Sequence, residues 1–258
     1  MVSLRQRLAS ALLLAVSSVG LMALSGCAVN NGYTALPELE PVGLRQLWNR
    51  TIPLLNDEQI THAWRVGDSI FVSTSHRRLI RLTMAGTIAF DVDLEHQTRD
   101  IFRPIDLGDN EHLLVVTQGW AFVLDKAAGE IERSRPLNMI VTTDPHVIGD
   151  TLCVGGLNFF YGLYLDQLGG HKWVTAAPDD SFVASPATVS NDLFLASRSG
   201  RLWRVDGATG DWVWKDRKTN GPVVAGRATD GSNLGIPCLD TRVYAFNAGN
   251  GGELWEAR

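Results

Sequence analysis

The 258-residue sequence has few residues of the kinds that most often build reactive or metal-binding centres. It contains three cysteines and six histidines. No two histidines have the spacing of a zinc-binding motif such as His-Glu-x-x-His. No glycine-rich loop precedes a helical pattern, so nucleotide binding has no support. We therefore predict no catalytic residue, no metal site and no cofactor.

Positive charge is also in deficit. Lysine and arginine number 23 against 28 aspartate and glutamate residues, which gives a net charge of −5. An acidic surface repels the phosphates of nucleic acids and of anionic lipids. Nucleic acid is therefore not an expected partner, and any attachment to a membrane requires a source other than surface charge.

Charged residues are absent from Leu8 to Leu24, an apolar run that follows Arg5 and Arg7. The run ends in Leu-Ser-Gly-Cys, with the cysteine at position 27. This order resembles the lipobox of bacterial lipoproteins, which are cut before the cysteine and acylated on it. It predicts a signal peptide over residues 1–26 and lipidation of Cys27. The alternative is a single transmembrane anchor, for which this run is close to the shortest usable length.

Lipidation of Cys27 predicts a protein held at a membrane through its N-terminus. Ala28 follows the cysteine, where the sorting rule of enteric bacteria would use Asp for inner-membrane retention. The resemblance therefore implies the outer membrane, with the protein facing the periplasm. Cleavage would lower the lysine and arginine total to 21 and leave 28 acids, a net charge of about −7. Residues 27–43 contain Gly32, Pro37 and Pro41 and predict a flexible tether.

Convincing helical patterns are absent after the tether, whereas a strand-turn-strand pattern recurs. Its clearest copy is GRLWRVDGATGDWVWK, from Gly200 to Lys215, in which DGATG supplies the turn. The turn glycines of successive copies are 43, 40, 41 and 41 residues apart; they are Gly86, Gly129, Gly169, Gly210 and Gly251. A fixed period of this length is typical of four-stranded propeller blades. The alternative is an ordinary β-sandwich whose self-similarity is accidental.

An aromatic residue usually follows each turn glycine by four positions, and we call this the docking position. It holds Phe90, Arg133, Trp173, Trp214 and Trp255, of which only Arg133 fits poorly. Each blade buries a face only by stacking on its neighbour, so these side chains are expected to dock blades together. The sequence thus predicts an all-β propeller over residues 44–258, with about five four-stranded blades.

One extra N-terminal strand is predicted at Leu44–Asn49, with Trp48 at its docking position. It could add to the last blade, replace the outer strand there, or belong to a ring that is not closed, and the sequence leaves these alternatives open. The first strands of the second to fifth blades are predicted at Ile101–Leu107, Ile140–Val147, Phe182–Thr188 and Val223–Ala228.

The pattern from Arg201 to Trp214 resembles the quinoprotein-type (PQQ-like) propeller repeat, and the resemblance spans about residues 44–258. That family contains periplasmic dehydrogenases with a quinone at the propeller axis. It also contains cofactor-free scaffolds, including the propeller lipoprotein subunit of the outer-membrane β-barrel assembly machine. The lipoprotein signal favours the scaffolds. The resemblance therefore implies a non-catalytic scaffold that binds other envelope proteins, β-barrel assembly components among them, although that subunit usually has eight blades.

The alternative function is a quinone- or calcium-dependent oxidoreductase, or a carbohydrate-active enzyme, that uses the propeller axis. Quinone dehydrogenases of this type resemble one another in an adjacent cysteine pair and a much longer chain. Cys153 and Cys238 instead fall on second strands two blades apart, too far for an expected disulfide. We expect both to be buried packing residues.

Two groups of side chains are candidates for a binding surface. Aromatic residues crowd one strand and form the candidate partner surface Phe159, Phe160, Tyr161 and Tyr164. The alternative is that both faces of this strand are buried between blades. Arginines near a blade turn could grip a carboxylate, or could form a solvated polar face; they are Arg77, Arg78 and Arg81.

Overall fold

The computed structural model describes residues 47–94, 100–176, 180–182, 184–223, 226 and 228–258. The chain divides into two compact units, residues 1–51 and residues 52–258. In the described residues all regular structure is β-strand and all of it lies in the second unit. This described part holds no helix of the length and hydropathy that a membrane crossing requires.

Twenty strands form five antiparallel sheets, each made of four consecutive strands. The first sheet contains β1 (Ile60–Val66), β2 (Ser69–Thr74), β3 (Arg78–Thr83) and β4 (Ile88–Asp93). The second contains β5 (Ile105–Asp106), β6 (His112–Val116), β7 (Trp120–Asp125) and β8 (Ile131–Pro136). The third contains β9 (His146–Ile148), β10 (Thr151–Gly155), β11 (Phe159–Tyr164) and β12 (His171–Ala176).

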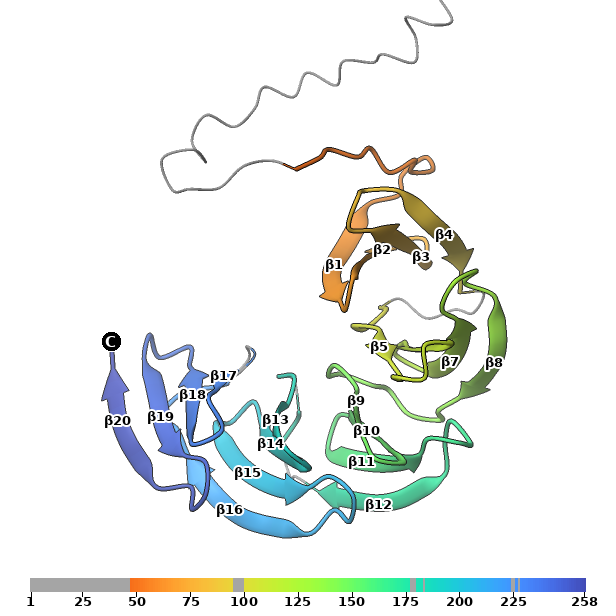
Figure 1. Ribbon diagram of the computed structural model, residues 1–258. Coiled ribbons are helices and arrows are strands. Elements are labelled where there is room, and N and C mark those ends of the chain that lie inside the picture. Colours follow the sequence, from red (N-terminus) through yellow and green to blue (C-terminus); the bar gives the residue numbers. More distant parts are fainter. Residues whose placement is uncertain (1–46, 95–99, 177–179, 183, 224–225, 227) are drawn as a thin grey trace, which may run out of the picture. The chain divides into compact units, whose positions relative to one another are not determined.

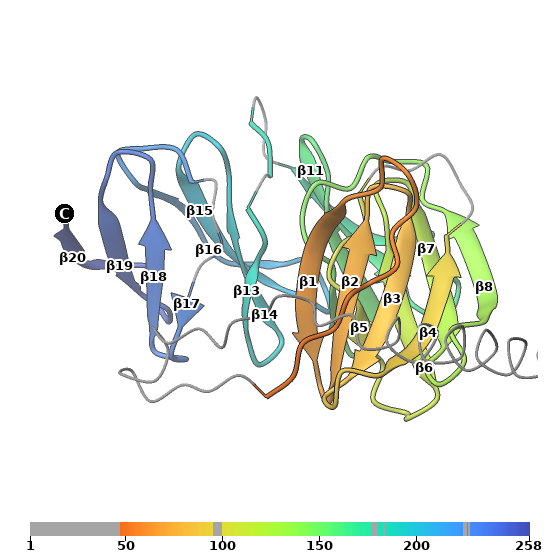
Figure 2. The same ribbon diagram turned by 90° about the horizontal axis from the view of Figure 1, so that it is seen from above.

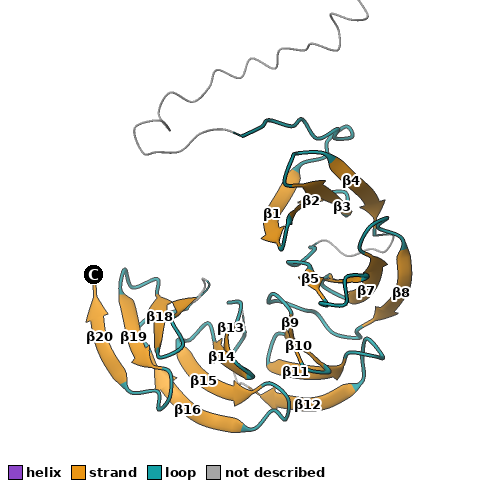
Figure 3. Ribbon diagram, viewed as in Figure 1, coloured by secondary structure: helices purple, strands orange, loops and turns teal. Residues whose placement is uncertain are grey.

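The fourth sheet contains β13 (Ala187–Val189), β14 (Asp192–Ala196), β15 (Arg201–Asp206) and β16 (Trp212–Lys218). The fifth contains β17 (Ala228–Thr229), β18 (Asn233–Pro237), β19 (Val243–Asn247) and β20 (Glu253–Ala257). Within residues 52–258 the sheets follow one another along an arc, with each first strand inside and each fourth strand outside (Figure 1). Figure 3, coloured by secondary structure, shows strands joined only by loops and turns. The predicted all-β propeller of five four-stranded blades is confirmed.

Hydrophobic clusters join each sheet to the next, because alternating side chains fill both faces of the middle strands. Leu79 and Phe122 share the cluster between the first and second sheets, and Phe160 and Trp203 share the one between the third and fourth. Similar clusters join the second to the third and the fourth to the fifth. Among the described residues no cluster combines the first sheet with the fifth. Figure 1 shows the first and fifth sheets at the two ends of the arc; in the view from above, β17–β20 lie on the left and β1–β4 lie to the right of them (Figure 2).

The other face of the first sheet is already covered. Val72, Ile80 and Leu82 are buried there, with Ile52 and Ile88 packed against them. Ile52 comes from the segment that leads into β1. The first sheet therefore presents little exposed apolar surface on the side that faces away from the second sheet.

The first strands of the later sheets are shorter than predicted. The predicted strand at Ile101–Leu107 is a single bridge at Ile101 followed by the two-residue β5, and Phe182 likewise forms only a bridge before β13. Proline lacks the N–H that a ladder needs, and Pro104, Pro145 and Pro186 directly precede β5, β9 and β13 of the second, third and fourth sheets, at intervals of 41 residues. The first sheet has no proline in β1, which runs for seven residues.

The extra N-terminal strand is not found in the described residues. Leu47, Trp48 and Asn49 belong to no sheet, and positions 44–46 lie outside the described residues. A strand requires a hydrogen-bonded neighbour, and no strand pairs with residues 47–49. Trp48, which belongs to the first unit, has intermediate exposure.

Candidate functional site

The docking tryptophans of the third and fourth sheets make the same contact with the next sheet. The indole Nε1 of Trp173 donates a hydrogen bond to the carbonyl of Gly207 at 3.1 Å, and that of Trp214 donates to the carbonyl of Ala248 at 3.0 Å. Both side chains are buried, Trp214 with 7% exposure. Each contact joins the fourth strand of one sheet to the turn between the third and fourth strands of the next.

The turn glycines leave room for these rings. Gly210 has a φ of 79°, and a Cβ there would come within 2.7 Å of the Trp173 ring. A Cβ at Gly251 would come within 2.9 Å of Trp214, and one at Gly129 within 2.6 Å of Phe90. The turn requires a residue that readily adopts the left-handed conformation, and the aromatic ring requires that this residue have no side chain. Together these two demands explain why glycine and aromatic residue recur at one spacing.

In the contact between the first and second sheets, one residue packs on the turn and another donates the hydrogen bond. Phe90 is buried against the turn but has no N–H to donate. Arg81, its cross-strand neighbour, donates instead from its guanidinium to the carbonyl of Lys126 in the same turn. The sequence offers Arg81 as a residue that could grip a carboxylate, whereas its guanidinium holds two sheets together.

The contact between the second and third sheets uses arginine and leucine in place of tryptophan. Arg133 donates to the carbonyl of Asp166 at 2.8 Å, and Arg135 donates to that of Gln167 at 2.9 Å. Leu168 is buried in the cluster between these sheets, in a left-handed conformation with φ of 52°. The apolar filler therefore comes from the turn, which a sequence search at the docking position could not find.

Trp255 does not meet the expectation of a docked side chain. It lies on β20 at the same cross-strand position as Trp214 on β16, but it is 53% exposed. Its indole N–H has no acceptor among the described residues. The reason is that burial at this position comes from the next sheet, and no described sheet follows the fifth.

The predicted partner surface is divided by the pleat of β11. Phe160 points into the cluster between the third and fourth sheets, where it stacks on Trp173 and meets Phe182 edge-on. Phe160 is therefore core rather than surface. Phe159 and Tyr164 are exposed, and Tyr161 is half-buried beside Phe159 and His171. Of the four aromatics, only Phe159 and Tyr164 offer open surface.

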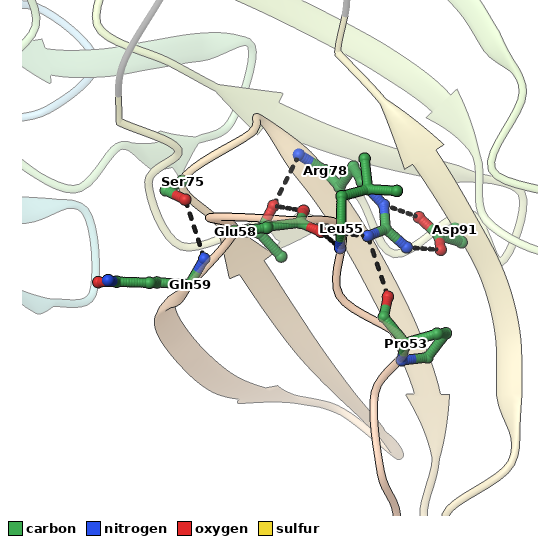
Figure 4. A network of polar contacts seen from close by, with 8 residues as sticks. Pro53, Leu55, Glu58, Gln59, Ser75, Arg78 and Asp91 are labelled. Carbon is green, nitrogen blue, oxygen red and sulfur yellow. Dashed lines mark hydrogen bonds and ion pairs between the residues drawn. The ribbon is translucent and has the colours of Figure 1, made fainter.

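Arg78 grips carboxylates of its own chain. It donates to Glu58 at 2.6 Å, to both oxygens of Asp91, and to the carbonyl of Pro53 at 3.1 Å (Figure 4). Figure 4 shows the guanidinium between Asp91 on β4 and the segment that precedes β1. Glu58 has a fully buried side chain that also accepts from Thr74. The network fixes the segment at residues 53–59 against the first sheet.

The Glu58 carboxyl stays ionised in this network. Burial alone would raise its pKa, but hydrogen bonds from Thr74, from the Leu55 N–H and from Arg78 outweigh burial and hold the pKa below its ordinary value. A buried carboxylate is tolerated only when it is paired in this way. The arginine and its two acids therefore have a structural role here.

The cysteines occupy different environments. Cys153 is fully buried between the third and fourth sheets, where burial raises the pKa of its thiol to about 12. Cys238 is half-buried beside the core of the fifth sheet, and both are free thiols. Cys27 lies outside the described residues.

A cavity of about 380 Å³ opens on the inner side of the arc. His62 and Trp64, which stack at 5.1 Å, form one wall, and Asp100, Asp144 and Ser185 are among the residues of the others. Asp144 accepts from the Ser185 hydroxyl and Asp100 from the Gln118 amide. Over the described ranges, no group of three or more His, Cys, Asp or Glu side chains is placed to hold a metal ion.

Comparison with solved structures places this fold among known propellers. The crystal structure of BamB from Moraxella catarrhalis is 21% identical, with a TM-score of 0.56, and the match covers 74% of this chain and 61% of that one. The crystal structure of the computationally designed Ika8 protein is 12% identical, with a TM-score of 0.62, and the match covers 77% of this chain and 61% of Ika8. At these identities the likeness shows the fold alone. The chain spans about 61% of the length of each.

Comparison of the sequence with family models gives a more specific result. No curated protein matches the sequence. The model described as "Outer membrane protein assembly factor BamB" matches residues 117–258, which is more than half of the chain. That range contains the third-to-fourth-strand turns of the second to fifth sheets, on which the contacts between sheets are built. The chain therefore belongs to the outer membrane protein assembly factor BamB family.

Proposed function

We propose that this protein is a lipid-anchored, periplasm-facing scaffold that assists the assembly of outer-membrane β-barrel proteins without catalysing a reaction. The observation that carries the proposal is the family match over residues 117–258. The lipobox-like sequence that ends at Cys27 supports the anchor and the location. A stack of sheets with exposed strand edges and faces is suited to binding other polypeptides, including extended strands that add to a sheet edge.

Cross-linking in cells followed by purification from native membranes tests the scaffold role. We expect the recovered partners to be β-barrel assembly components or unassembled barrel proteins. Recovery of no envelope protein above the background of a matched control lipoprotein would contradict the proposal. A stoichiometric quinone chromophore or bound calcium in the purified protein would favour the enzyme alternative instead.

The anchor is tested separately by Cys27→Ser. Acylation requires the cysteine thiol, so the variant should remain uncleaved or become soluble, and it should take up no labelled fatty acid. Cys153→Ser is the matched control, because it removes a buried thiol and leaves position 27 intact. Unchanged acylation of Cys27→Ser would refute the anchor.

A further inference from the structure

The contact between the second and third sheets is the only contact between described sheets that places no aromatic ring on a turn glycine. In the other three contacts Phe90, Trp173 and Trp214 lie against a turn glycine of the next sheet. The second sheet has Arg133 at the docking position instead. Beside this contact a cavity of about 420 Å³ lies between the two sheets. Both sheets have a neighbour on each side, so the cavity does not depend on the sheets at the ends of the arc.

The cavity combines apolar side chains with hydrogen-bond donors. Leu137 and Leu163, which line it, are buried, whereas Arg135, Asn138 and His171, which also line it, are exposed. None of the described residues in its lining is acidic. A guanidinium beside buried leucines suits a carboxylate that is attached to an apolar group.

Two arginines bring positive charge to this cavity without a carboxylate to balance it. Arg133 and Arg135 donate to the carbonyls of Asp166 and Gln167, and neither forms an ion pair within the described part of the chain. Arg78, by contrast, binds two carboxylates. A guanidinium has five N–H donors, so the bond from Arg135 to Gln167 leaves donors for a further acceptor. Charge complementarity therefore favours an anionic ligand.

A strip of aromatic and apolar side chains leads from the cavity across the third sheet. The ring of His171 lies 5.1 Å from that of Tyr161, which lies 6.0 Å from that of Phe159. Val174 pairs with Tyr161 across the strands and therefore faces the same side. Phe159 is 42% exposed and Val174 is 46% exposed. We call Phe159, Tyr161, His171 and Val174 the third-sheet strip.

The place of Val174 is polar in every other sheet. Val174 directly follows the docking position, and the residues that follow it in the other four sheets are Asp91, Ser134, Lys215 and Glu256. In the first and fifth sheets this residue forms an ion pair, Arg78–Asp91 and Arg242–Glu256. The third sheet has an exposed apolar surface where those sheets have an ion pair. An exposed apolar patch that is rimmed by polar residues marks an interaction site.

We infer that the cavity and the third-sheet strip together bind an acidic, apolar segment of a partner polypeptide. A carboxylate of the segment accepts hydrogen bonds from Arg135, and apolar side chains close to it lie along Phe159 and Val174. Arginine recognises carboxylates through charge-assisted hydrogen bonds, and burial of the apolar side chains adds to the affinity. The inference rests on the proposed function only for the source of the segment, an envelope protein.

Segments of this chain are poorer occupants. The β3–β4 turn of the first sheet, residues 83–87, carries no charge and so supplies no carboxylate. Residues 36–41 contain Glu38 and Glu40 next to leucines, and they lie outside the described residues. They belong to the tether predicted over residues 27–43, which must span the distance from the lipid to the propeller. The same segment of a second copy is the remaining alternative.

A short peptide of this chemistry is the direct probe. It is Gly-Ser-Phe-Glu-Leu-Ser-Gly with blocked ends and a fluorescent label, titrated against the full chain in a Cys27→Ser background. We expect saturable binding below about 1 mM that weakens with added salt and is lost when glutamine replaces the glutamate of the peptide. In the ¹⁵N-labelled chain the peptide should shift the backbone amide signals of Asn138, Gly170 and His171.

Variants with matched controls locate the site. Arg135→Gln should weaken binding about tenfold or more, because the carboxylate loses its charged donor. Arg217→Gln is the control, since Arg217 on β16 also donates to a turn carbonyl of the next sheet but lies away from the cavity. Val174→Ser should weaken binding through the apolar half of the site. Val213→Ser removes an exposed valine of β16 and should leave the affinity unchanged.

Four outcomes would overturn the inference. The first two are absence of saturable binding and equal weakening by Arg135→Gln and Arg217→Gln. Tighter peptide binding by the full chain with Glu38→Gln and Glu40→Gln would assign the cavity to the chain's own segment. A concentration-dependent dimer that the peptide dissociates, seen by sedimentation, would assign it to a second copy. The test uses purified protein, so failure of the cross-linking experiment and failure of peptide binding are distinguishable.

Discussion

The fourth and fifth sheets carry a tryptophan at the same place in the repeat, yet Trp214 is 7% exposed and Trp255 is 53% exposed. Both lie on a fourth strand, opposite a residue of the third strand. The difference lies beyond each sheet, since the fifth sheet covers Trp214 and no described sheet covers Trp255. Burial in this fold is therefore supplied by the neighbour and not by the strand that carries the side chain.

The largest expected effect is the loss of stability in Trp214→Ala. The substitution removes a buried aromatic side chain and its hydrogen bond to Ala248, so we expect a loss of roughly 3 to 5 kcal/mol in the free energy of unfolding. Urea unfolding would measure it. A loss below about 1 kcal/mol would show that the docking position contributes little and would remove the contrast with Trp255.

A glycine substitution tests the other half of the contact. Gly210→Ala places a Cβ against the Trp173 ring in a left-handed conformation, and should cost about 2 to 4 kcal/mol. Gly108 is the matched control, because its φ is 81° and a Cβ there would meet nothing within 4 Å. Gly108→Ala should cost only about 1 kcal/mol. Equal losses would mean that the ring does not constrain the turn.

The third expectation concerns the exposed tryptophan. Trp255→Ala should change the free energy of unfolding by less than about 1 kcal/mol, because the exposed side chain has few buried contacts that the substitution could remove. The same urea unfolding experiment serves as the measurement. A loss similar to that of Trp214→Ala would show that a segment of the chain covers Trp255 in solution.

The smallest effect is on thiol chemistry rather than on stability. In a Cys27→Ser background, Cys238 should react slowly with a thiol reagent at a pH of about 8. Cys153 should react only on unfolding, because its pKa of about 12 leaves almost no thiolate and the neighbouring sheet covers it. Labelling followed by mass spectrometry would separate the two sites. Rapid labelling of Cys153 would contradict the packing of the third sheet on the fourth.

The fold was predictable because each repeat is marked by residues that lie close together in the sequence. A turn that requires glycine and a ring that lies on that glycine recur together along the chain, as at Gly210 and Trp173. The shortness of β5, β9 and β13 was not predicted, although Pro104, Pro145 and Pro186 directly precede them. Those prolines have the same 41-residue spacing as the last repeats, and a ladder cannot pass through them.

The contacts between sheets were predictable only in part. Between the second and third sheets, Leu168 from the turn of the third sheet fills the space that a docking tryptophan of the second sheet would fill. The residue at the docking position of the second sheet gives no sign of this replacement. The carboxylates that Arg78 grips are 20 positions before it and 13 after it in the chain. The exposure of Trp255 is set by the surface that lies against the fifth sheet, and its own repeat carries no information about that surface.

Hydrogen exchange of the tryptophan indole N–H groups, followed by NMR, tests the central claim most directly. If each sheet docks its tryptophan on the turn of the next, the N–H groups of Trp173 and Trp214 should exchange slowly, and that of Trp255 should exchange at nearly the rate of a free indole. Protection of Trp255 equal to that of Trp214, or exchange of Trp214 as fast as that of Trp255, would contradict the account.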